Sequence, residues 1–269
     1  MAATEGVAPA FDLDAYLRDL GVPPDRWLYY RFQSRRYGSI VQLLGQVGSL
    51  TGKDLLDLGG GIGALALTAR SRLGGTYDLA EAEEIDAPRA AALHRHGIRE
   101  YYRVELGRPG GLSALTRPYD VVLLIEVLEH LLVNPLHLFR EIRTHLKPGG
   151  YLLITTPNLA RLRNRLRLLA GRSIKDRWRY PRTVGEVNGH VIEYTRPELT
   201  ELLLSEGFRT VHASVVQQEP SVRSTALGRF GVRLLDTRLA NRWDLGDNIR
   251  GLYRAIEGWS DPPAPGQRV

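Results

Sequence analysis

The sequence contains no cysteine among its 269 residues. Disulfide bonds and thiolate metal sites are therefore excluded, and we expect a cytoplasmic protein. The sequence also has no apolar run of the length, about 18 residues, that a membrane-spanning helix needs. Residues 1–14 show no basic region followed by an apolar stretch, so we expect no export signal.

Acidic residues are scarce in one segment. Residues 159–182 contain nine lysines and arginines against one acid, Asp176, which gives this segment a charge of +8. The whole chain has a net charge of +6, so the remainder carries −2. Basicity is therefore a local feature, and it favours one binding site over a generally basic surface.

Hydrophobic residues make up 43% of the sequence, enough to build a sizeable core. From residue 54 onward, short apolar runs alternate with amphipathic helical segments. This alternation is typical of a parallel sheet with helices on both faces. We predict strands near residues 54–58, 76–85, 99–106, 119–126, 151–157, 208–217 and 248–256.

The segments around this pattern define the expected domain boundaries. Residues 1–50 have a helical pattern, and we expect them to form a lid over a ligand cleft. Residues 51–260 form the main α/β domain, with an insertion at 159–190. The tail, residues 261–269, is rich in proline and glycine, so we expect it to be flexible.

Two helices carry clear signals at their ends. Asn134 followed by Pro135 predicts an N-cap and a first helical residue, and the Pro-Gly-Gly sequence at 148–150 is expected to stop that helix. Thr195 with Glu198 predicts a capping box at the start of another helix, which should end at Gly207.

A glycine loop follows the first predicted strand. Gly59, Gly61 and Ala64 fit the dinucleotide fingerprint, so the glycines alone leave the ligand open. Asp57 decides between the alternatives, because a carboxylate there would repel a pyrophosphate but attract the amine and sulfonium of S-adenosylmethionine (SAM). We therefore expect SAM to bind at this loop.

Further acids follow the next two strands. Glu84 is our preferred ligand for the ribose hydroxyls, with Asp86 as the N-cap of the next helix, and Glu81 remains an alternative for the ribose. Glu105 ends the third predicted strand, where it can accept from the adenine amino group. Three acids at strand ends beside a glycine loop favour SAM over a dinucleotide.

Four motifs resemble those of class I SAM-dependent methyltransferases of the kind that includes ubiquinone-biosynthesis O-methyltransferases. They are DLGGGIG at 57–63, YDVVLLIEVLEH at 119–130, LKPGG at 146–150 and TTPN at 155–158. The resemblance covers residues 31–256 and makes 51–260 the methyltransferase domain. It implies a Rossmann-like α/β fold with a seven-stranded mixed sheet in the order 3-2-1-4-5-7-6, strand seven antiparallel and helices on both faces.

The same resemblance implies roles for individual residues. The implied cofactor ligands are Asp57, Gly59, Gly61 and Gly63 at the methionine end, Glu84 at the ribose, Glu105 with the Leu106 amide at the adenine, and Glu126. Two features depart from the family pattern. The second strand is longer and more acidic than usual, and Arg250 and Arg254 lie in a final strand that is usually apolar.

Two histidines are candidates for catalysis. Methyl transfer from a sulfonium is a direct displacement, so positioning supplies much of the acceleration, and a hydroxyl acceptor also needs a base. His130 follows the fourth predicted strand, where the methyl group should lie, and His190 follows the fifth. Each can also be read as a rim residue that only shapes the pocket.

A metal site is an alternative for the same region. Glu126, Glu129, His130 and His190 resemble the ligands of small-RNA 3′-terminal 2′-O-methyltransferases, in which they hold Mg²⁺ or Mn²⁺. The same motifs also occur in methyltransferases of ubiquinone and sugar pathways that often lack a metal. The resemblance therefore leaves a divalent metal as an alternative.

The basic segment predicts an amphipathic helix near the acceptor. Its leucines share one face, and its arginines occupy the rest: Leu159, Leu162, Leu166 and Leu169 against Arg161, Arg163, Arg165 and Arg167. Such a helix can grip phosphates through Arg163 and Arg167, rest on an anionic membrane through residues 159–182, or simply pack as a lid. Trp178, Tyr180 and Tyr194 are candidates for stacking on the acceptor.

These features predict O-methylation of a small-molecule, glycosyl or lipid-linked acceptor, and they disfavour a nucleic-acid partner. Two alternatives remain open. Metal-dependent 2′-O-methylation of RNA would show chelator sensitivity and a steep salt dependence of RNA binding. A SAM-binding module without turnover would bind the cofactor and transfer no methyl group.

Overall fold

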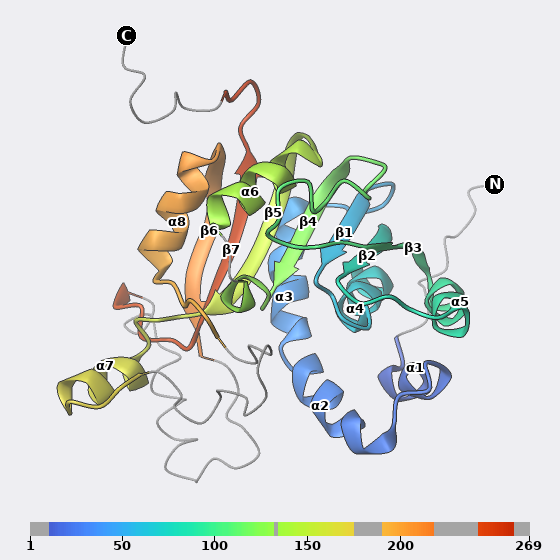
Figure 1. Cartoon of the computed structure of the whole chain (residues 1–269), viewed down its shortest axis with the longest axis horizontal. Helices are drawn as coiled ribbons and strands as arrows, with labels where there is room; N and C mark the ends of the chain where they lie inside the picture. The colour runs from blue at the N-terminus through green and yellow to red at the C-terminus, as the bar shows by residue number, and fades with distance from the viewer. Residues whose placement is uncertain (1–10, 132–133, 175–189, 218–241, 261–269) are drawn as a thin grey trace.

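A computed structural model describes residues 11–131, 134–174, 190–217 and 242–260. Seven strands form one sheet in the predicted order, β3-β2-β1-β4-β5-β7-β6 (Figure 1). β7 runs antiparallel to β5 and β6, and the other pairings are parallel. The strands are β1 Asp54–Leu58, β2 Thr76–Glu81, β3 Ile98–Arg103, β4 Tyr119–Ile125, β5 Leu146–Pro157, β6 Phe208–Val216 and β7 Asn248–Ala255.

Helices cover both faces of this sheet (Figure 1). The described α-helices are α1 Leu13–Asp19, α2 Pro24–Ser34, α3 Tyr37–Leu44, α4 Ala64–Leu73, α5 Ala87–His96, α6 Pro135–Thr144, α7 Leu162–Leu169 and α8 Arg196–Ser205. Two 3-10 turns, η1 Gly45–Val47 and η2 Leu128–His130, complete the described elements. None of the described helices has the length and apolarity that a membrane crossing requires.

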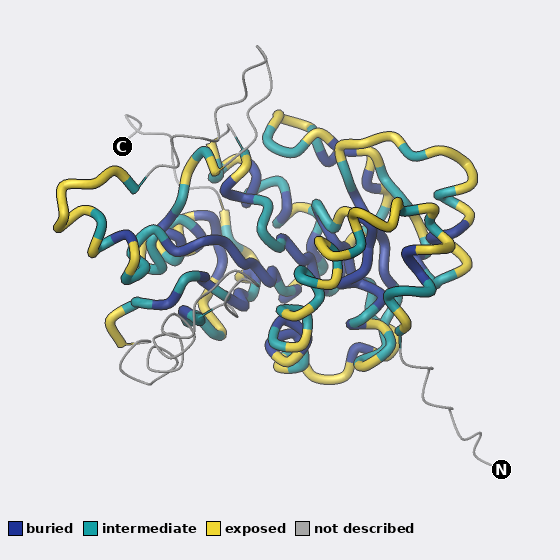
Figure 2. The backbone as a smooth tube through the Cα atoms, turned by 90° about the horizontal axis from the view of Figure 1, so that it is seen from below, coloured by how far each residue is buried: buried dark blue, intermediate teal, exposed yellow. Residues whose placement is uncertain are grey.

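Each face of the sheet has its own hydrophobic core. On one face, residues of α6 and α8 pack against the strands, with Phe139 and Leu199 fully buried. On the other, α1, α3 and α4 pack against the strands, with Tyr16 and Leu44 buried. Figure 2 shows the buried segments gathered in the interior of the molecule and the exposed ones at its periphery. The two cores explain why each central strand is apolar on both faces.

The predicted helix caps are confirmed. The Asn134 side chain accepts from the backbone N–H of Leu136 at 3.0 Å, and α6 begins at Pro135. Thr195 and Glu198 form a reciprocal capping box at the start of α8. Asp86 caps α5 by accepting from the Arg89 N–H at 2.9 Å. These three starts depend on local chemistry only, which explains why sequence predicts them.

The predicted stop of α6 was wrong. The helix ends at Thr144, and the carbonyl of His145 already accepts from the Tyr119 N–H at 2.8 Å. The Pro-Gly-Gly sequence at 148–150 lies inside β5, where the pairing with β4 shifts register. Gly149 supports this irregularity with a φ of 68°, in the left-handed region that glycine tolerates.

Two strand ends were also predicted too far along the chain. β2 ends at Glu81 rather than residue 85, and β3 ends at Arg103 rather than residue 106. The Val104 N–H still donates to the Glu81 carbonyl at 2.8 Å. Beyond this bond side chains link the two segments, since the Tyr101 hydroxyl donates to the Glu83 carbonyl at 2.7 Å and Arg103 lies 3.6 Å from Glu84. The acid at the end of β2 is therefore Glu81.

The described part of the N-terminal segment is helical, as expected. α1 and α3 belong to the core, whereas α2 has no fully buried residue. The Tyr16 hydroxyl donates to the carbonyl of Ile62 in the glycine loop. α1 thus contacts the loop after β1 through this hydrogen bond, and the role of residues 1–50 as a lid stays a prediction.

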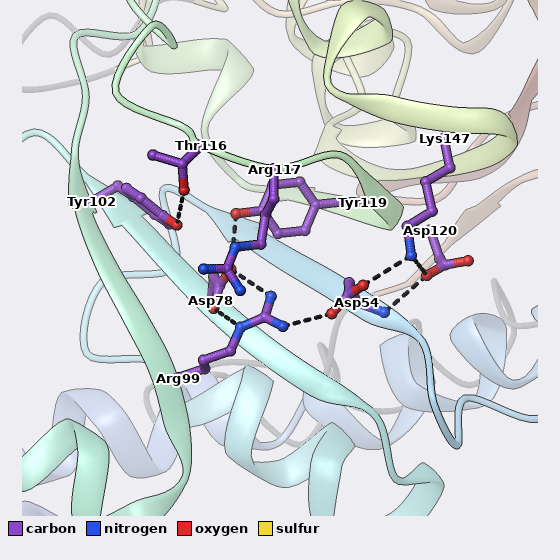
Figure 3. A network of polar contacts seen from close by, with 9 residues as sticks. All are labelled: Asp54, Asp78, Arg99, Tyr102, Thr116, Arg117, Tyr119, Asp120 and Lys147. Carbon is purple, nitrogen blue, oxygen red and sulfur yellow. Dashed lines mark hydrogen bonds and ion pairs between the residues drawn. The ribbon is translucent and has the colours of Figure 1, made fainter.

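A partly buried ionic network, centred on buried Asp78, links the strands towards their amino ends (Figure 3). Asp78 on β2 is fully buried, and Arg99 on β3 donates to both of its oxygens at 2.8 and 2.7 Å. The Tyr119 hydroxyl of β4 also donates to Asp78, at 2.9 Å. Arg99 continues the network to Asp54 on β1 at 2.6 Å. Adjacent parallel strands are therefore linked by charge as well as by their backbones.

Lys147 extends the network to β5. Its ammonium donates to Asp54 at 2.8 Å and to Asp120 at 2.7 Å. The burial of Asp54 is outweighed by hydrogen bonds from Lys147 and Arg99, which lower the pKa of Asp54. The network lies at the edge of the sheet opposite the carboxyl ends of β1 and β4.

Candidate functional site

The glycine loop after β1 approaches its neighbours closely. Gly59, Gly61 and Gly63 have φ values of 76°, 62° and 74°, which favour glycine at all three positions. A Cβ at Gly60 would lie 2.4 Å from Cγ of Asp57, and one at Gly59 would lie 2.4 Å from Val127. The loop is therefore packed between the end of β1 and the turn after β4.

Asp57 is the distinctive group of this site. It is fully buried at the end of β1, and within the described residues neither of its carboxylate oxygens has a hydrogen-bond partner. Burial, together with the charge of Glu81, raises the pKa of Asp57 to about 7. A buried carboxylate without a partner is costly to a folded protein, so it points to a cationic ligand.

The acids predicted for the ribose and the adenine lie in different settings. Glu81 ends β2, and its carboxylate accepts from the Gly61 N–H of the glycine loop. Glu84 lies three residues beyond the strand, is 82% exposed, and pairs with Arg103 at 3.6 Å. The structure thus brings Glu81 to the loop and leaves Glu84 outside it.

The third segment expected at the cofactor lies after β3. Glu105 is two residues beyond the strand end, and its side chain pairs with Arg108 at 2.7 Å. Leu106 is partly buried against the core. Both residues follow the carboxyl end of β3, and their role at the adenine stays a prediction.

Glu126 joins four segments at the end of β4. Its carboxylate accepts from Arg36 at 2.8 Å, from the Thr155 hydroxyl at 2.8 Å and from Asn248 at 2.7 Å. Its φ of 55° is unusual for a residue other than glycine. The sequence pointed to Glu126 but not to its partners Arg36 and Asn248. Arg36 directly precedes α3, and Asn248 is the first residue of β7.

Three of the four residues proposed as metal ligands lie together. Ligand atoms of Glu129, His130 and His190 are all within 4.8 Å of one another, and the two imidazole rings lie 5.3 Å apart. Burial, with the charge of Glu126, raises the pKa of Glu129 to about 7. The carboxylate of the fourth residue, Glu126, instead accepts hydrogen bonds from Arg36, Thr155 and Asn248.

Backbone and side-chain contacts hold this cluster in place. The Val191 N–H donates to the Glu129 carbonyl at 2.7 Å, so the chain around His190 is tied to the turn after β4. Nδ1 of His190 lies 2.8 Å from a carboxylate oxygen of Glu193. The Thr156 hydroxyl donates to Glu129 at 3.0 Å. The side chain of His130 remains 49% exposed, so an acceptor can reach it.

The predicted acceptor residues separate into three groups. Arg163 and Arg167 on α7 line a cavity of about 550 Å³, with Leu162, Leu166 and Leu245 as its apolar wall. Tyr194 is 8% exposed and packs in the core, so packing alone accounts for this aromatic residue. Trp178 and Tyr180 lie outside the described residues.

The sheet order, the glycine loop and the buried acid together define the class I SAM-dependent methyltransferase fold. The profile of the family described as "Methyltransferase domain" matches residues 29–213, more than half of the chain. The chain therefore belongs to the methyltransferase domain family and is a SAM-dependent methyltransferase. No curated protein sequence matches it significantly.

Solved structures share this fold at low sequence identity. One is a chain from the Haloferax volcanii complex of the Trm112 methyltransferase activator with a provisionally assigned methyltransferase: 16% identity, 95% of this chain and 100% of that one, TM-score 0.55. Another is the cyclopropane synthase MmaA2 from Mycobacterium tuberculosis: 18% identity, 81% and 83%, TM-score 0.50. An O-methyltransferase family protein from Burkholderia thailandensis gives 15% identity, 85% and 57%, TM-score 0.55. At such identities the likeness concerns the fold alone.

Proposed function

We propose that this SAM-dependent methyltransferase methylates an oxygen atom of a small or lipid-linked acceptor, such as a glycosyl compound that carries phosphate. The observation that carries the proposal is the cavity of about 550 Å³ beside α7, which combines leucines with Arg163 and Arg167. Guanidinium groups bind phosphate in pairs of hydrogen bonds, and an apolar wall suits a hydrocarbon chain or a ring.

The cofactor lies along the carboxyl edge of the sheet in this proposal. Asp57 and the glycine loop bind the methionine end, where the amine and the sulfonium neutralise the buried carboxylate. Glu81 binds the ribose in place of Glu84, because only Glu81 reaches the loop. Glu105 and the Leu106 amide bind the adenine.

His130 is the base in this proposal. The acceptor oxygen attacks the methyl carbon, the carbon–sulfur bond breaks, and S-adenosylhomocysteine leaves with both electrons of that bond. The acceptor proton passes to His130, whose Nε2 lies 3.8 Å from a carboxylate oxygen of buried Glu129. That carboxylate stabilises the imidazolium that forms, and His190 shapes the same rim.

The exposed leucines of α7 fit an acceptor that lies in a membrane. Leu166 is 56% exposed and Leu169 is 84% exposed, next to the arginines of the same helix. A helix of this composition can rest on an anionic lipid surface. Cosedimentation with phosphatidylglycerol vesicles, and not with phosphatidylcholine vesicles, is the expected result.

The double variant Arg163→Glu with Arg167→Glu tests the acceptor cavity. A cell lysate is first incubated with the protein and with SAM that carries tritium in its methyl group. We expect the label to appear in the lipid or small-molecule fraction. With that acceptor, we expect the KM to rise at least about tenfold at a nearly unchanged kcat, because two charge-assisted contacts are lost. Arg209→Glu, an exposed position on β6, is the matched control. An unchanged KM would contradict the proposed grip, and no label in any fraction would favour the non-catalytic module.

Metal-dependent 2′-O-methylation of RNA is a second candidate. The closeness of Glu129, His130 and His190 favours it, since one carboxylate and two imidazoles suit Mn²⁺. Glu129, His130 and His190 would hold the metal, which would supply Lewis-acid activation of the acceptor oxygen. This candidate predicts that Mn²⁺ paramagnetic resonance shows a bound ion that His190→Ala abolishes, together with label in RNA and its loss with chelator. Label in lipid or small molecules that survives chelator excludes it.

A further inference from the structure

Helix α1 reaches the glycine loop from outside the predicted methyltransferase domain, residues 51–260. Tyr16 on this helix is fully buried, and its hydroxyl donates to the backbone carbonyl of Ile62 in the loop. The two residues are 46 positions apart in the sequence. The loop after β1 therefore has a partner in a segment that the sequence assigns only to a lid.

The Ile62 carbonyl needs a donor from another part of the chain. The N-cap of α4 is Gly63, and its carbonyl accepts the first bond of that helix, from the Leu67 N–H at 3.0 Å. The carbonyl of Ile62 comes before this cap and lies outside the hydrogen-bond ladder of α4. Ile62 is also 5% exposed, so water has little access to it. A buried carbonyl without a donor is costly, and the Tyr16 hydroxyl removes that cost.

Two other hydrogen bonds hold the first part of the loop. The Gly59 N–H donates to the Ala80 carbonyl at 2.8 Å, and the Gly61 N–H donates to the Glu81 carboxylate. Both acceptors belong to β2. The loop is thus tied to β2 at its start and in its middle, and to α1 near its end. Because glycine adopts many conformations, such ties help to select one of them.

The ring of Tyr16 is itself held from two sides. Its centroid lies 5.2 Å from that of Phe11 and 4.8 Å from that of His96, both in edge-to-face arrangements. His96 is in the last turn of α5, and its Nε2 lies 2.8 Å from the Asp19 carboxylate of α1. Arg95 donates to the same carboxylate at 2.9 Å. Burial raises the pKa of Tyr16, so its hydroxyl stays protonated at neutral pH and remains a donor.

We infer that Tyr16 is a positioning residue of the cofactor site: through its hydroxyl, α1 holds the glycine loop in the conformation that binds the methionine end of SAM. The inference rests on the proposed placement of that end at the loop. Tyr16 acts through the Ile62 carbonyl. Its loss therefore weakens binding of the methionine end and spares the adenosine part, which is placed at the acids after β2 and β3.

Two nucleosides that differ at the methionine end test this role. S-adenosylhomocysteine carries the amino acid group, and 5′-methylthioadenosine has a methyl group in its place. Calorimetry measures the affinity of the wild type and of Tyr16→Phe for both. We expect the variant to bind S-adenosylhomocysteine at least about tenfold more weakly, and methylthioadenosine within about twofold of the wild type. Hydrogen exchange of the backbone at residues 59–63 should also become faster.

Tyr119→Phe is the matched control. Tyr119 is also fully buried, and its hydroxyl donates to Asp78 at 2.9 Å, in the network towards the amino ends of the strands. This variant should lower the Tm and leave both affinities unchanged. Should Tyr16→Phe fail to fold, Asp19→Ala at an exposed position removes both contacts of Asp19 with α5. We expect it to weaken S-adenosylhomocysteine alone, by about threefold.

The outcomes distinguish this inference from the proposed function. Equal weakening of both nucleosides in Tyr16→Phe, or full affinity for S-adenosylhomocysteine, would overturn the positioning role of Tyr16. A wild type that binds S-adenosylhomocysteine no more tightly than methylthioadenosine would instead overturn the placement of the methionine end at the glycine loop.

Discussion

Asp57→Asn lowers the affinity for SAM by about a hundredfold or more and at the same time stabilises the ligand-free protein. The carboxylate is fully buried, within the described residues no hydrogen bond of normal geometry satisfies it, and the backbone N–H of Ala66 offsets its burial only in part, so we expect a cationic ligand to compensate its charge. Breaking a buried charge pair costs about 3–5 kcal/mol, which corresponds to this loss of affinity. Calorimetry with SAM measures the first effect, and urea unfolding measures the second.

The stabilisation should depend on pH with a definite sign. Because the pKa of Asp57 is raised from 3.8 to about 7, the folded state holds a proton that the unfolded state loses between these values. The free energy of unfolding of the wild type therefore falls as pH rises from about 4 to about 7. Asp57→Asn removes that decline. The difference in free energy of unfolding between the variant and the wild type is therefore larger at pH 8 than at pH 4.

An exposed acid provides the control for this variant. Asp25→Asn on α2 should change neither the SAM affinity nor the unfolding free energy measurably. SAM affinity retained in Asp57→Asn would contradict the electrostatic role of this carboxylate, whatever happened to stability.

Arg99→Met lowers the free energy of unfolding by about 3–5 kcal/mol. It removes both hydrogen bonds to Asp78 and leaves this fully buried carboxylate with the Tyr119 hydroxyl at 2.9 Å and Arg117 at 3.9 Å. For a chain of this size the change corresponds to a fall in Tm of roughly 10 °C, which calorimetry or circular dichroism can follow.

Arg95→Met is the matched control for this network. Arg95 pairs with Asp19 at 2.9 Å but is 56% exposed, so water screens the pair and the Tm should hardly change. An equal fall in Tm for the two variants would show that the network of Figure 3 contributes nothing specific.

Features with local or repeated signals were predictable from the sequence. The caps at Asn134 and Thr195 depend on neighbouring residues, and the sheet order came from motifs that match a known family. The ends of the strands were harder to predict from the sequence. β2 stops at Glu81 because its last hydrogen bond with the chain after β3 lies there, and this pairing has no signal within the strand itself.

Contacts between distant segments escaped prediction altogether. Glu126 is separated by 90 residues from Arg36 and by 122 from Asn248, and no spacing in the sequence links them. The composition of β7 gave only an indirect signal, since Arg250 was out of place in a strand expected to be apolar. Its place between Thr155 of β5 and Ser214 of β6 follows only from the register of the three strands in the folded sheet.

Calorimetric titration of the wild-type protein with SAM and, separately, with NAD measures which of the two cofactors the protein binds. We expect saturable binding of SAM at one site and no measurable binding of NAD, because Asp57 attracts the cationic cofactor and repels a diphosphate. Tight binding of NAD, with SAM failing to bind, would contradict this expectation.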